Sequence, residues 1–250
     1  MSKIDIRSMY LPELENFLAE MGEPRFRAKQ IFHWLQSGVT DFDEMSDISK
    51  ALRERLKADA YIASAETERR YASRLDETVK YVFRLFDGEL IETVLMKYEH
   101  GYTVCISTQV GCRMGCKFCA SGINGLTRSL TASEMLAQIT AVQRDNNIRV
   151  SNIVMMGMGE PLDNFDNSVR FLKLVSDEKG LNIGLRHISL STSGVVSGIK
   201  KLKEYNLPIT LSISLHAPSD DIRSSVMPVN KRWSIDELLA ACKEYQAVTT

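Results

Sequence analysis

The first 75 residues place apolar side chains three and four positions apart, which is the spacing of amphipathic helices. In "LPELENFLAEMG" this spacing puts Leu11, Leu14, Phe17, Leu18 and Met21 on one face. The segments "RFRAKQIFHWLQSG" and "ISKALRERLKADA" repeat it. We therefore predict a small helical domain over residues 1–75.

The period then changes to that of strands. The segment "VKYVFRLFDGELIETVLMK" contains two runs rich in β-branched and aromatic residues on either side of Asp87-Gly88. This dipeptide between such runs is a strong hairpin signal. We predict a β-hairpin connector over residues 76–100.

From residue 101 to 250 strand-like runs alternate with helical patterns. The runs "TVCIST", "NIVMMGMG", "HISLSTSG" and "PITLSISLHA" each precede a helix, and capping boxes mark two of the helix starts, at Thr131/Glu134 and Ser234/Glu237. Four β-then-α units in a row predict an α/β fold with a parallel sheet. Loops that follow the strands are where such folds place their chemistry.

The predicted sheet ends early. No strand follows the helix of the fourth unit, so the sheet has an open edge at that point. By pattern alone, this end is either a true terminus or a truncation.

Composition indicates what type of protein this is and where in the cell it acts. The chain of 250 residues has a net charge of -1 and 44% hydrophobic residues, as in ordinary globular proteins. No global positive field favours nucleic acid, so any such contact must come from a local patch. The N-terminus does not resemble a signal peptide, and no run reaches the roughly 18 apolar residues of a membrane span. We expect a cytoplasmic protein with no membrane contact.

Four of the five cysteines fall within "CISTQVGCRMGCKFCASG", residues 105–122. In a cytoplasmic protein this bunching favours metal binding or thiol chemistry over disulfides. Cys112, Cys116 and Cys119 have the spacing C-x3-C-x2-C, with Phe118 before the last cysteine. Structural zinc takes four protein ligands, whereas three cysteines on a four-iron cluster leave one iron free to bind a small molecule. The spacing favours the cluster over a zinc site with a remote fourth ligand.

These motifs, together with "IVMMGMGEPLDN", "ISLSTSGVV" and "ISLHAPSDDIRSSVMPVN", resemble the RlmN/Cfr family of radical S-adenosylmethionine RNA methylases, and RlmN more than Cfr. The resemblance covers essentially the whole chain. It implies a radical S-adenosylmethionine barrel with a [4Fe–4S] cluster on Cys112, Cys116 and Cys119, whose open iron chelates S-adenosylmethionine. The implied contacts to that cofactor are Phe118 near the adenine, Gly159 and Glu160 at the methionyl amine, and Ser191, Ser214, Leu215 and His216.

The same resemblance gives roles to two further residues. Cys105 matches the thiol that resolves a methylene-linked protein–RNA intermediate by forming a transient disulfide, and Glu92 matches the proposed proton acceptor. By pattern alone, Cys105 is a core residue and Glu92 a solvated one. By resemblance, the methyl-carrying cysteine of the family and the last strands of its (β/α) barrel are expected beyond residue 250, so we expect this chain to be a fragment with only a partial barrel. Cys242 lies among core-face positions and is no substitute.

By resemblance, the function is methylation of adenine C2 in 23S rRNA and tRNA by a monomer that takes electrons from a flavodoxin or ferredoxin. The alternatives are Cfr-type methylation at adenine C8 and a non-catalytic RNA-binding module with a cluster or zinc. In "PRFRAKQIFHW" basic residues alternate with aromatic ones, as in RNA-binding surfaces, but by sequence alone an amphipathic helix with a charged face is the better explanation. The resemblance makes RNA contact by this segment a hypothesis.

Overall fold

The computed structural model of the protein describes residues 3–249. Its N-terminal part is helical, as predicted, with buried Leu11, Leu14 and Leu18 on the predicted face of the first helix. A short parallel strand pair closes this part. Its elements are β1 (Ile4–Asp5), η1 (Ile6–Ser8), α1 (Leu11–Glu20), α2 (Arg25–Ser37), η2 (Phe42–Glu44), α3 (Lys50–Asp59) and β2 (Ala60–Tyr61).

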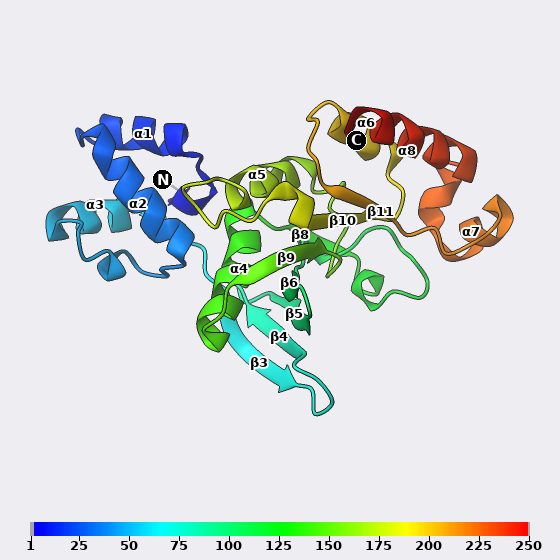
Figure 1. The fold of residues 1–250 in the computed structure, drawn as a ribbon, viewed down its shortest axis with the longest axis horizontal. Coiled ribbons are helices and arrows are strands. Elements are labelled where there is room, and N and C mark those ends of the chain that lie inside the picture. Colours follow the sequence, from blue (N-terminus) through cyan, green and yellow to red (C-terminus); the bar gives the residue numbers. More distant parts are fainter. Residues whose placement is uncertain (1–2, 250) are drawn as a thin grey trace.

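A seven-stranded sheet forms the centre of the molecule, in the order β11-β10-β9-β6-β5-β4-β3 (Figure 1). Neighbours among β6, β9, β10 and β11 pair in parallel, which confirms the predicted α/β class, while β3, β4 and β5 extend the sheet with antiparallel pairs. The strands are β3 (Glu66–Ala72), β4 (Val79–Arg84), β5 (Leu90–Tyr98), β6 (Gly101–Cys105), β9 (Val150–Met155), β10 (Ile188–Thr192) and β11 (Thr210–Ile213).

One stretch differs from the sequence-based prediction. Residues 66–72, which were included in the helical segment, form the edge strand β3, and every residue of β3 is exposed. A strand with no buried face has no apolar alternation, so its pattern could not reveal it. The predicted hairpin is present as β4 and β5, but it is part of the main sheet rather than a separate connector.

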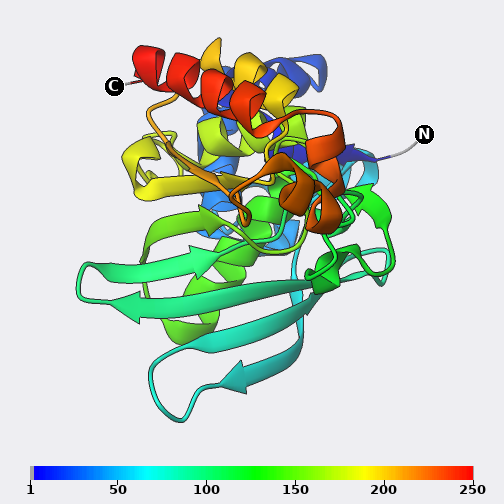
Figure 2. The ribbon, with the colours of Figure 1, turned by 90° about the vertical axis from the view of Figure 1, so that its right-hand side faces the viewer.

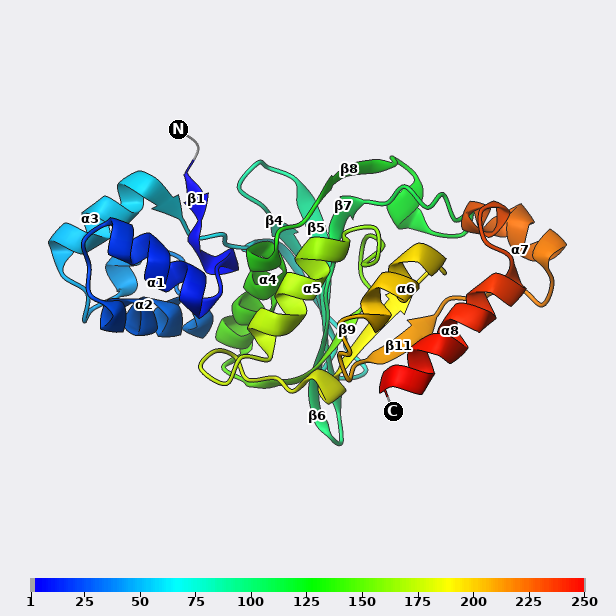
Figure 3. The ribbon, with the colours of Figure 1, turned by 90° about the horizontal axis from the view of Figure 1, so that it is seen from above.

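Helices cover one face of the sheet, as Figure 3 shows from above. They are α4 (Ala132–Asn146), α5 (Phe165–Val175), α6 (Val196–Lys203) and α8 (Ile235–Thr249). The short helix α7 (Asp220–Val226) lies beyond β11, and 3-10 turns form at η4 (Leu185–His187) and η5 (Pro228–Lys231). Both predicted capping boxes are present, at Thr131/Glu134 and at Ser234/Glu237. No helix within residues 3–249 is long and apolar enough to cross a bilayer.

The two faces of the sheet differ in burial. In β5, Ile91, Thr93 and Leu95 are buried toward the helices, while Glu92 and Val94 alternate with them on the other face. No helix within residues 3–249 covers this second face, which we call the open face, and Figure 2 shows the strands extending past the helices. Within the described residues the sheet ends at β3 and β11 and does not close.

The helical domain docks on the helix layer through polar contacts. Arg170 of α5 forms an ion pair with Glu13 at 2.6 Å, and the backbone N–H of Ser133 donates to Ser8 Oγ at 3.0 Å. Buried Arg7 donates to Thr140 Oγ1 of α4 at 2.9 Å. The domain is therefore fixed to α4 and α5 and leaves the open face free.

Candidate active site

The cysteine loop begins where β6 ends. It includes the small antiparallel sheet of β7 (Gln109–Gly111) and β8 (Leu126–Ser129) and the turn η3 (Ala120–Gly122). Backbone hydrogen bonds fix the loop at both sides: Cys112 N–H donates to Gly125 O at 2.8 Å, and Lys117 N–H donates to Val226 O at 2.9 Å. The second bond ties the loop to the end of α7.

A cavity of about 260 Å³ lies between this loop and the carboxyl ends of β9, β10 and β11. It brings together nine of the residues predicted for the cluster and the cofactor, which come from segments up to a hundred residues apart. These are Cys112, Cys116, Cys119, Phe118, Gly159, Glu160, Ser191, Ser214 and His216. Met155, the last residue of β9, and Met156, which follows it, line this cavity as well.

Glu160 is the acidic residue that lines the cysteine cavity. Its side chain is buried, with a residue exposure of 3%, and its carboxylate accepts hydrogen bonds from Ser193 N–H at 2.7 Å and Leu162 N–H at 3.1 Å. Burial raises the pKa of this carboxyl, and the hydrogen bonds from Ser193 and Leu162 oppose that rise. A buried carboxylate at a cavity wall is a natural partner for an ammonium group.

The three thiols are partly or fully buried in the cavity. Burial raises the pKa of Cys112 to about 11 and also raises that of Cys116, with smaller contributions from Glu160 and the neighbouring thiols. Protonated thiols release their protons when a soft metal binds, so binding of such a metal here would be coupled to proton loss.

Whether the donors fit a cluster follows from their chemistry. Three soft sulfur donors on one wall match the ligands of an iron–sulfur cluster. Within residues 3–249, however, no three Cys, His, Asp or Glu side chains lie close enough to one another to hold a metal ion. The thiols thus share a cavity without being gathered at ligand distances.

The aromatic side of the cavity comes from two loops. Phe118 and His216 meet edge to face with ring centroids 4.8 Å apart, and Phe118 is 56% exposed. The hydroxyls of Ser191 and Ser214 lie 3.3 Å apart across β10 and the end of β11. Leu215 does not line the cavity; its side chain packs against the core and its carbonyl accepts a hydrogen bond from Arg223.

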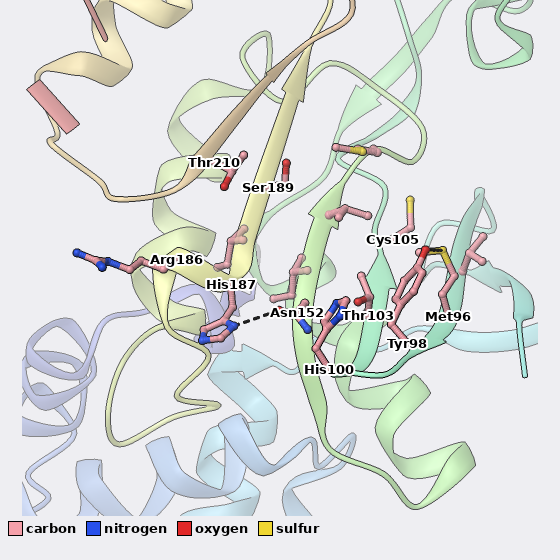
Figure 4. Close-up of a pocket in the computed structure, with 15 residues that line it drawn as sticks. Met96, Tyr98, His100, Thr103, Cys105, Asn152, Arg186, His187, Ser189 and Thr210 are labelled. Atoms are coloured by element: carbon pink, nitrogen blue, oxygen red, sulfur yellow. Dashed lines mark hydrogen bonds between the residues drawn. The ribbon is translucent and has the colours of Figure 1, made fainter. Parts of the chain in front are cut away.

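Cys105 lies on the open face, in a second cavity of about 600 Å³ that Figure 4 shows. It pairs with Val94 across β5 and β6, and burial raises the pKa of its thiol. Met156 lines both this cavity and the cysteine cavity, so the two adjoin. All five cysteines are free thiols, and the expected transient disulfide has no counterpart among residues 3–249.

Glu92 shares the open face with Cys105, since it precedes Val94 by two positions on β5. Its carboxylate forms an ion pair with Lys80 of β4 at 2.6 Å. Glu92 is half exposed and does not line either cavity. The structure therefore puts both predicted residues on one face without placing them in contact.

The basic and aromatic segment of α2 is mostly engaged within the protein. Phe32 is 1% exposed and cannot stack on a base, Trp34 Nε1 donates to Asp47, and Arg25 is paired with Glu15. The amphipathic-helix interpretation is thus correct for Phe32. Phe26 remains 54% exposed, with the guanidinium of Arg27 4.9 Å from its ring centroid.

The sequence did not single out several residues that hold the site together. Gln109 Oε1 accepts from Glu160 N–H at 2.9 Å, and Gln109 Nε2 donates to Asp163 at 2.8 Å. Ser193 and Met227 line the cysteine cavity, and fully buried Arg223 binds the loops that follow β10 and β11. All four lie within motifs quoted from the sequence, but no role was predicted for any of them. Nothing in the local pattern distinguishes Gln109 or Arg223.

Two family models match the chain: the ribosomal RNA large subunit methyltransferase N-terminal domain over residues 4–62 and the radical SAM superfamily over residues 106–250. The crystal structure of a radical SAM methyltransferase from Sphaerobacter thermophilus is similar, with a TM-score of 0.93 and 45% identity, covering 98% of this chain and 73% of that one. The fold and the site are therefore those of a radical SAM methyltransferase, an enzyme rather than a binding module.

Curated relatives indicate the family within this class of methyltransferases. Proteins named probable dual-specificity RNA methyltransferase RlmN from Alkaliphilus oremlandii and Clostridium novyi are 54% and 49% identical to the chain. Each match covers 98% of this chain, and 71% and 72% of the respective relative. The chain belongs to the RlmN family.

Proposed function

We propose that this enzyme methylates C2 of adenine in 23S rRNA and in tRNA, with S-adenosylmethionine and a [4Fe–4S] cluster held by Cys112, Cys116 and Cys119. The observation that carries the proposal is the convergence of these three thiols with buried Glu160 in one cavity, beside the cavity of Cys105. The names of the relatives, which describe dual-specificity RNA methyltransferases, support RNA as the substrate.

The residues around the cysteine cavity divide the binding of S-adenosylmethionine among them. Glu160 receives the methionyl ammonium, because its carboxylate is buried and held by two backbone N–H groups. Phe118 and His216 offer ring surfaces to the adenine, while Ser191 and Ser214 offer hydroxyls. Gly159 lets the backbone approach closely, and Leu215 contributes through the backbone of its loop. When bound, the cluster supplies the electron that cleaves S-adenosylmethionine reductively.

Cys105 and Glu92 serve the RNA side of the reaction. The Cys105 thiol acts as the resolving nucleophile that displaces methylated RNA from a second protein sulfur and forms a disulfide with it. Glu92 accepts the proton that the methylated base loses. Lys80 holds the Glu92 carboxylate on the open face, and movement of RNA onto this face brings the base to both residues.

The remaining assignments follow from the reaction. A one-electron donor of the flavodoxin or ferredoxin type reduces the cluster, the enzyme acts as a monomer, and its RNA substrates place it in the cytoplasm. Residues 1–75 form the accessory domain, residues 76–100 the hairpin and residues 101–250 the radical core. In the α2 segment, exposed Phe26, with Arg27 over its ring, and the exposed Lys29 and His33 remain available to RNA.

The radical half is tested by anaerobic reconstitution with iron and sulfide, followed by assay of 5′-deoxyadenosine after addition of S-adenosylmethionine and dithionite. We expect product from the wild type and from Cys242→Ala, whose cysteine lies outside both cavities, and none from Cys112→Ala. Equal product from Cys112→Ala would refute the assignment of the cluster.

The methylation half is tested by joining this chain to the C-terminal segment of an RlmN relative, the segment that by resemblance carries the methyl-bearing cysteine. RNA treated with this protein is digested and its nucleosides are identified by mass spectrometry. We expect 2-methyladenosine in both 23S rRNA and tRNA. The appearance of 8-methyladenosine instead would assign Cfr-type chemistry.

A further inference from the structure

Arg223 is a fully buried arginine in α7, and it binds only neutral acceptors. Its Nε donates to Leu215 O at 3.1 Å, one terminal nitrogen donates to Asn230 Oδ1 at 2.8 Å, and the other donates to Ser193 O at 2.5 Å and to Ser214 O at 3.5 Å. The guanidinium thus joins the loops that follow β10 and β11, both of which line the cysteine cavity.

No carboxylate pairs with this cation. Among residues 3–249, Arg223 takes part in no ion pair, whereas Arg128 and Arg170 each have a glutamate within 2.8 Å. Its acidic neighbour Asp220 accepts hydrogen bonds from Asn230 and from Ile235 N–H instead. A buried charge without a counter-ion is costly, and arginine does not escape the cost by losing its proton.

The cysteine loop packs against the segment that carries Arg223. Lys117 N–H donates to Val226 O at 2.9 Å, and a Cβ added at Gly115 would lie 3.6 Å from Pro228. Met227, whose N–H donates to Arg223 O, lines the same cavity as Cys116. Of the acidic groups near the guanidinium, the Cys116 sulfur, once it is deprotonated, acts on it more strongly than Asp220 does.

We propose that Arg223 is the built-in counter-cation of the three-thiolate site: a positioning residue that holds the two cofactor loops and raises the reduction potential of the cluster. The inference rests on the proposed cluster. Three thiolates make the site anionic, and a one-electron reduction adds a further negative charge. A fixed cation nearby stabilises the reduced form more than the oxidised form, since cluster potentials depend on net charge. This role also accounts for a buried arginine that lacks a carboxylate partner.

The test separates the charge of Arg223 from its hydrogen bonds. Arg223→Lys keeps the positive charge but loses most of the N–H donors of the guanidinium, whereas Arg223→Gln loses the charge. The double variant Asp220→Asn with Asn230→Asp keeps Arg223 and the total charge of the protein, but it moves a carboxylate from a neighbouring surface position into contact with the guanidinium. The double variant leaves the acceptors of Arg223 in place, so it stays informative if Arg223→Gln does not fold.

The readout is the midpoint potential of the reconstituted cluster, followed by electron paramagnetic resonance during a dithionite titration without S-adenosylmethionine or RNA. We expect Arg223→Gln and the double variant to have more negative potentials than the wild type, and Arg223→Lys to stay close to it. Equal potentials in the wild type and the double variant, at equal iron content, would overturn the counter-cation role and leave the proposed function standing. Failure of the wild type itself to bind a cluster would overturn the proposed function and this inference with it.

Discussion

Gly159 occupies a position where both the backbone and the space around it exclude a side chain. Its φ is +104°, a conformation that residues with a Cβ rarely adopt. A Cβ built there would lie 2.6 Å from Gln109 Cβ and 2.8 Å from Gln109 N. Gln109 is fully buried, so it cannot turn away. Gly159→Ala must therefore force apart the cysteine loop and the loop that carries Glu160.

The expected loss of folding free energy in Gly159→Ala has two parts. Holding alanine at this φ costs about 2 kcal/mol. Displacing Gln109 breaks its backbone bond to Met158 O at 3.1 Å and its side-chain bond from Glu160 N–H at 2.9 Å, and each loss costs about 1 kcal/mol. Together these come to about 4 kcal/mol, which is a large share of the typical total of about 5 to 15 kcal/mol. For a chain of this length that corresponds to a melting temperature about 12 °C lower.

Gly88 supplies the matched control. It also has a positive φ, +84°, but a Cβ there would meet nothing within 4 Å. Gly88→Ala should therefore show only the conformational cost, about 2 kcal/mol. Thermal unfolding followed by circular dichroism measures both variants, and binding of S-adenosylmethionine should fall only in Gly159→Ala. Equal destabilisation by the two variants would refute the steric part of the reasoning.

Three further predictions concern buried groups. Burial raises the pKa of Glu160 above its ordinary 4.5, so the folded state holds this proton to higher pH than the unfolded state does. The free energy of unfolding therefore falls as the pH rises from 4.5. Urea titrations at several pH values should show this fall in the wild type and a smaller fall in Glu160→Gln. Burial raises the pKa of Cys105, so the rate of its alkylation by iodoacetamide, measured by mass spectrometry, should keep rising beyond pH 9. A rate that levels off below pH 9 would contradict this argument. Gln138 forms hydrogen bonds of 2.7 to 3.0 Å with Thr93 and with both backbone groups of Ser107. In chemical denaturation, Gln138→Leu should lower the free energy of unfolding by about 3 kcal/mol, because these buried partners remain unsatisfied. An unchanged midpoint would show that water replaces the amide.

The sequence was sufficient for features that repeat a local rule. The parallel strands, the two capping boxes and the Asp87-Gly88 turn each follow from spacing or residue type over a few positions, and the structure confirms them. The motifs that line the cysteine cavity were found because each follows a strand, and the ends of parallel strands meet at one edge of a sheet. Position along a strand was therefore enough to bring distant segments together.

Other features depend on contacts between distant segments, and these leave no local pattern. β3 is stabilised by pairing with β4 and not by an apolar face, so its residues read as an exposed polar stretch. Arg223 is buried because the carbonyls of three other residues surround it, which composition cannot foretell. Leu215 was expected among the cofactor contacts, but its partly buried side chain packs against the core and does not line the cysteine cavity. A family motif indicates which loop takes part, but it does not specify which way each side chain points.

The groups that line the cysteine cavity are fixed to different degrees. The Glu160 carboxylate is held by two backbone N–H groups, and its loop is bound to Gln109. The thiols share the cavity but are not gathered at ligand distances among the described residues. Because thiols lose their protons when they bind a soft metal, a metal bound here would itself have to draw them together. Under the proposed function, the carboxylate is thus preorganised for S-adenosylmethionine, whereas the thiol site would be completed only by the cluster, next to the segment that carries the buried cation of Arg223.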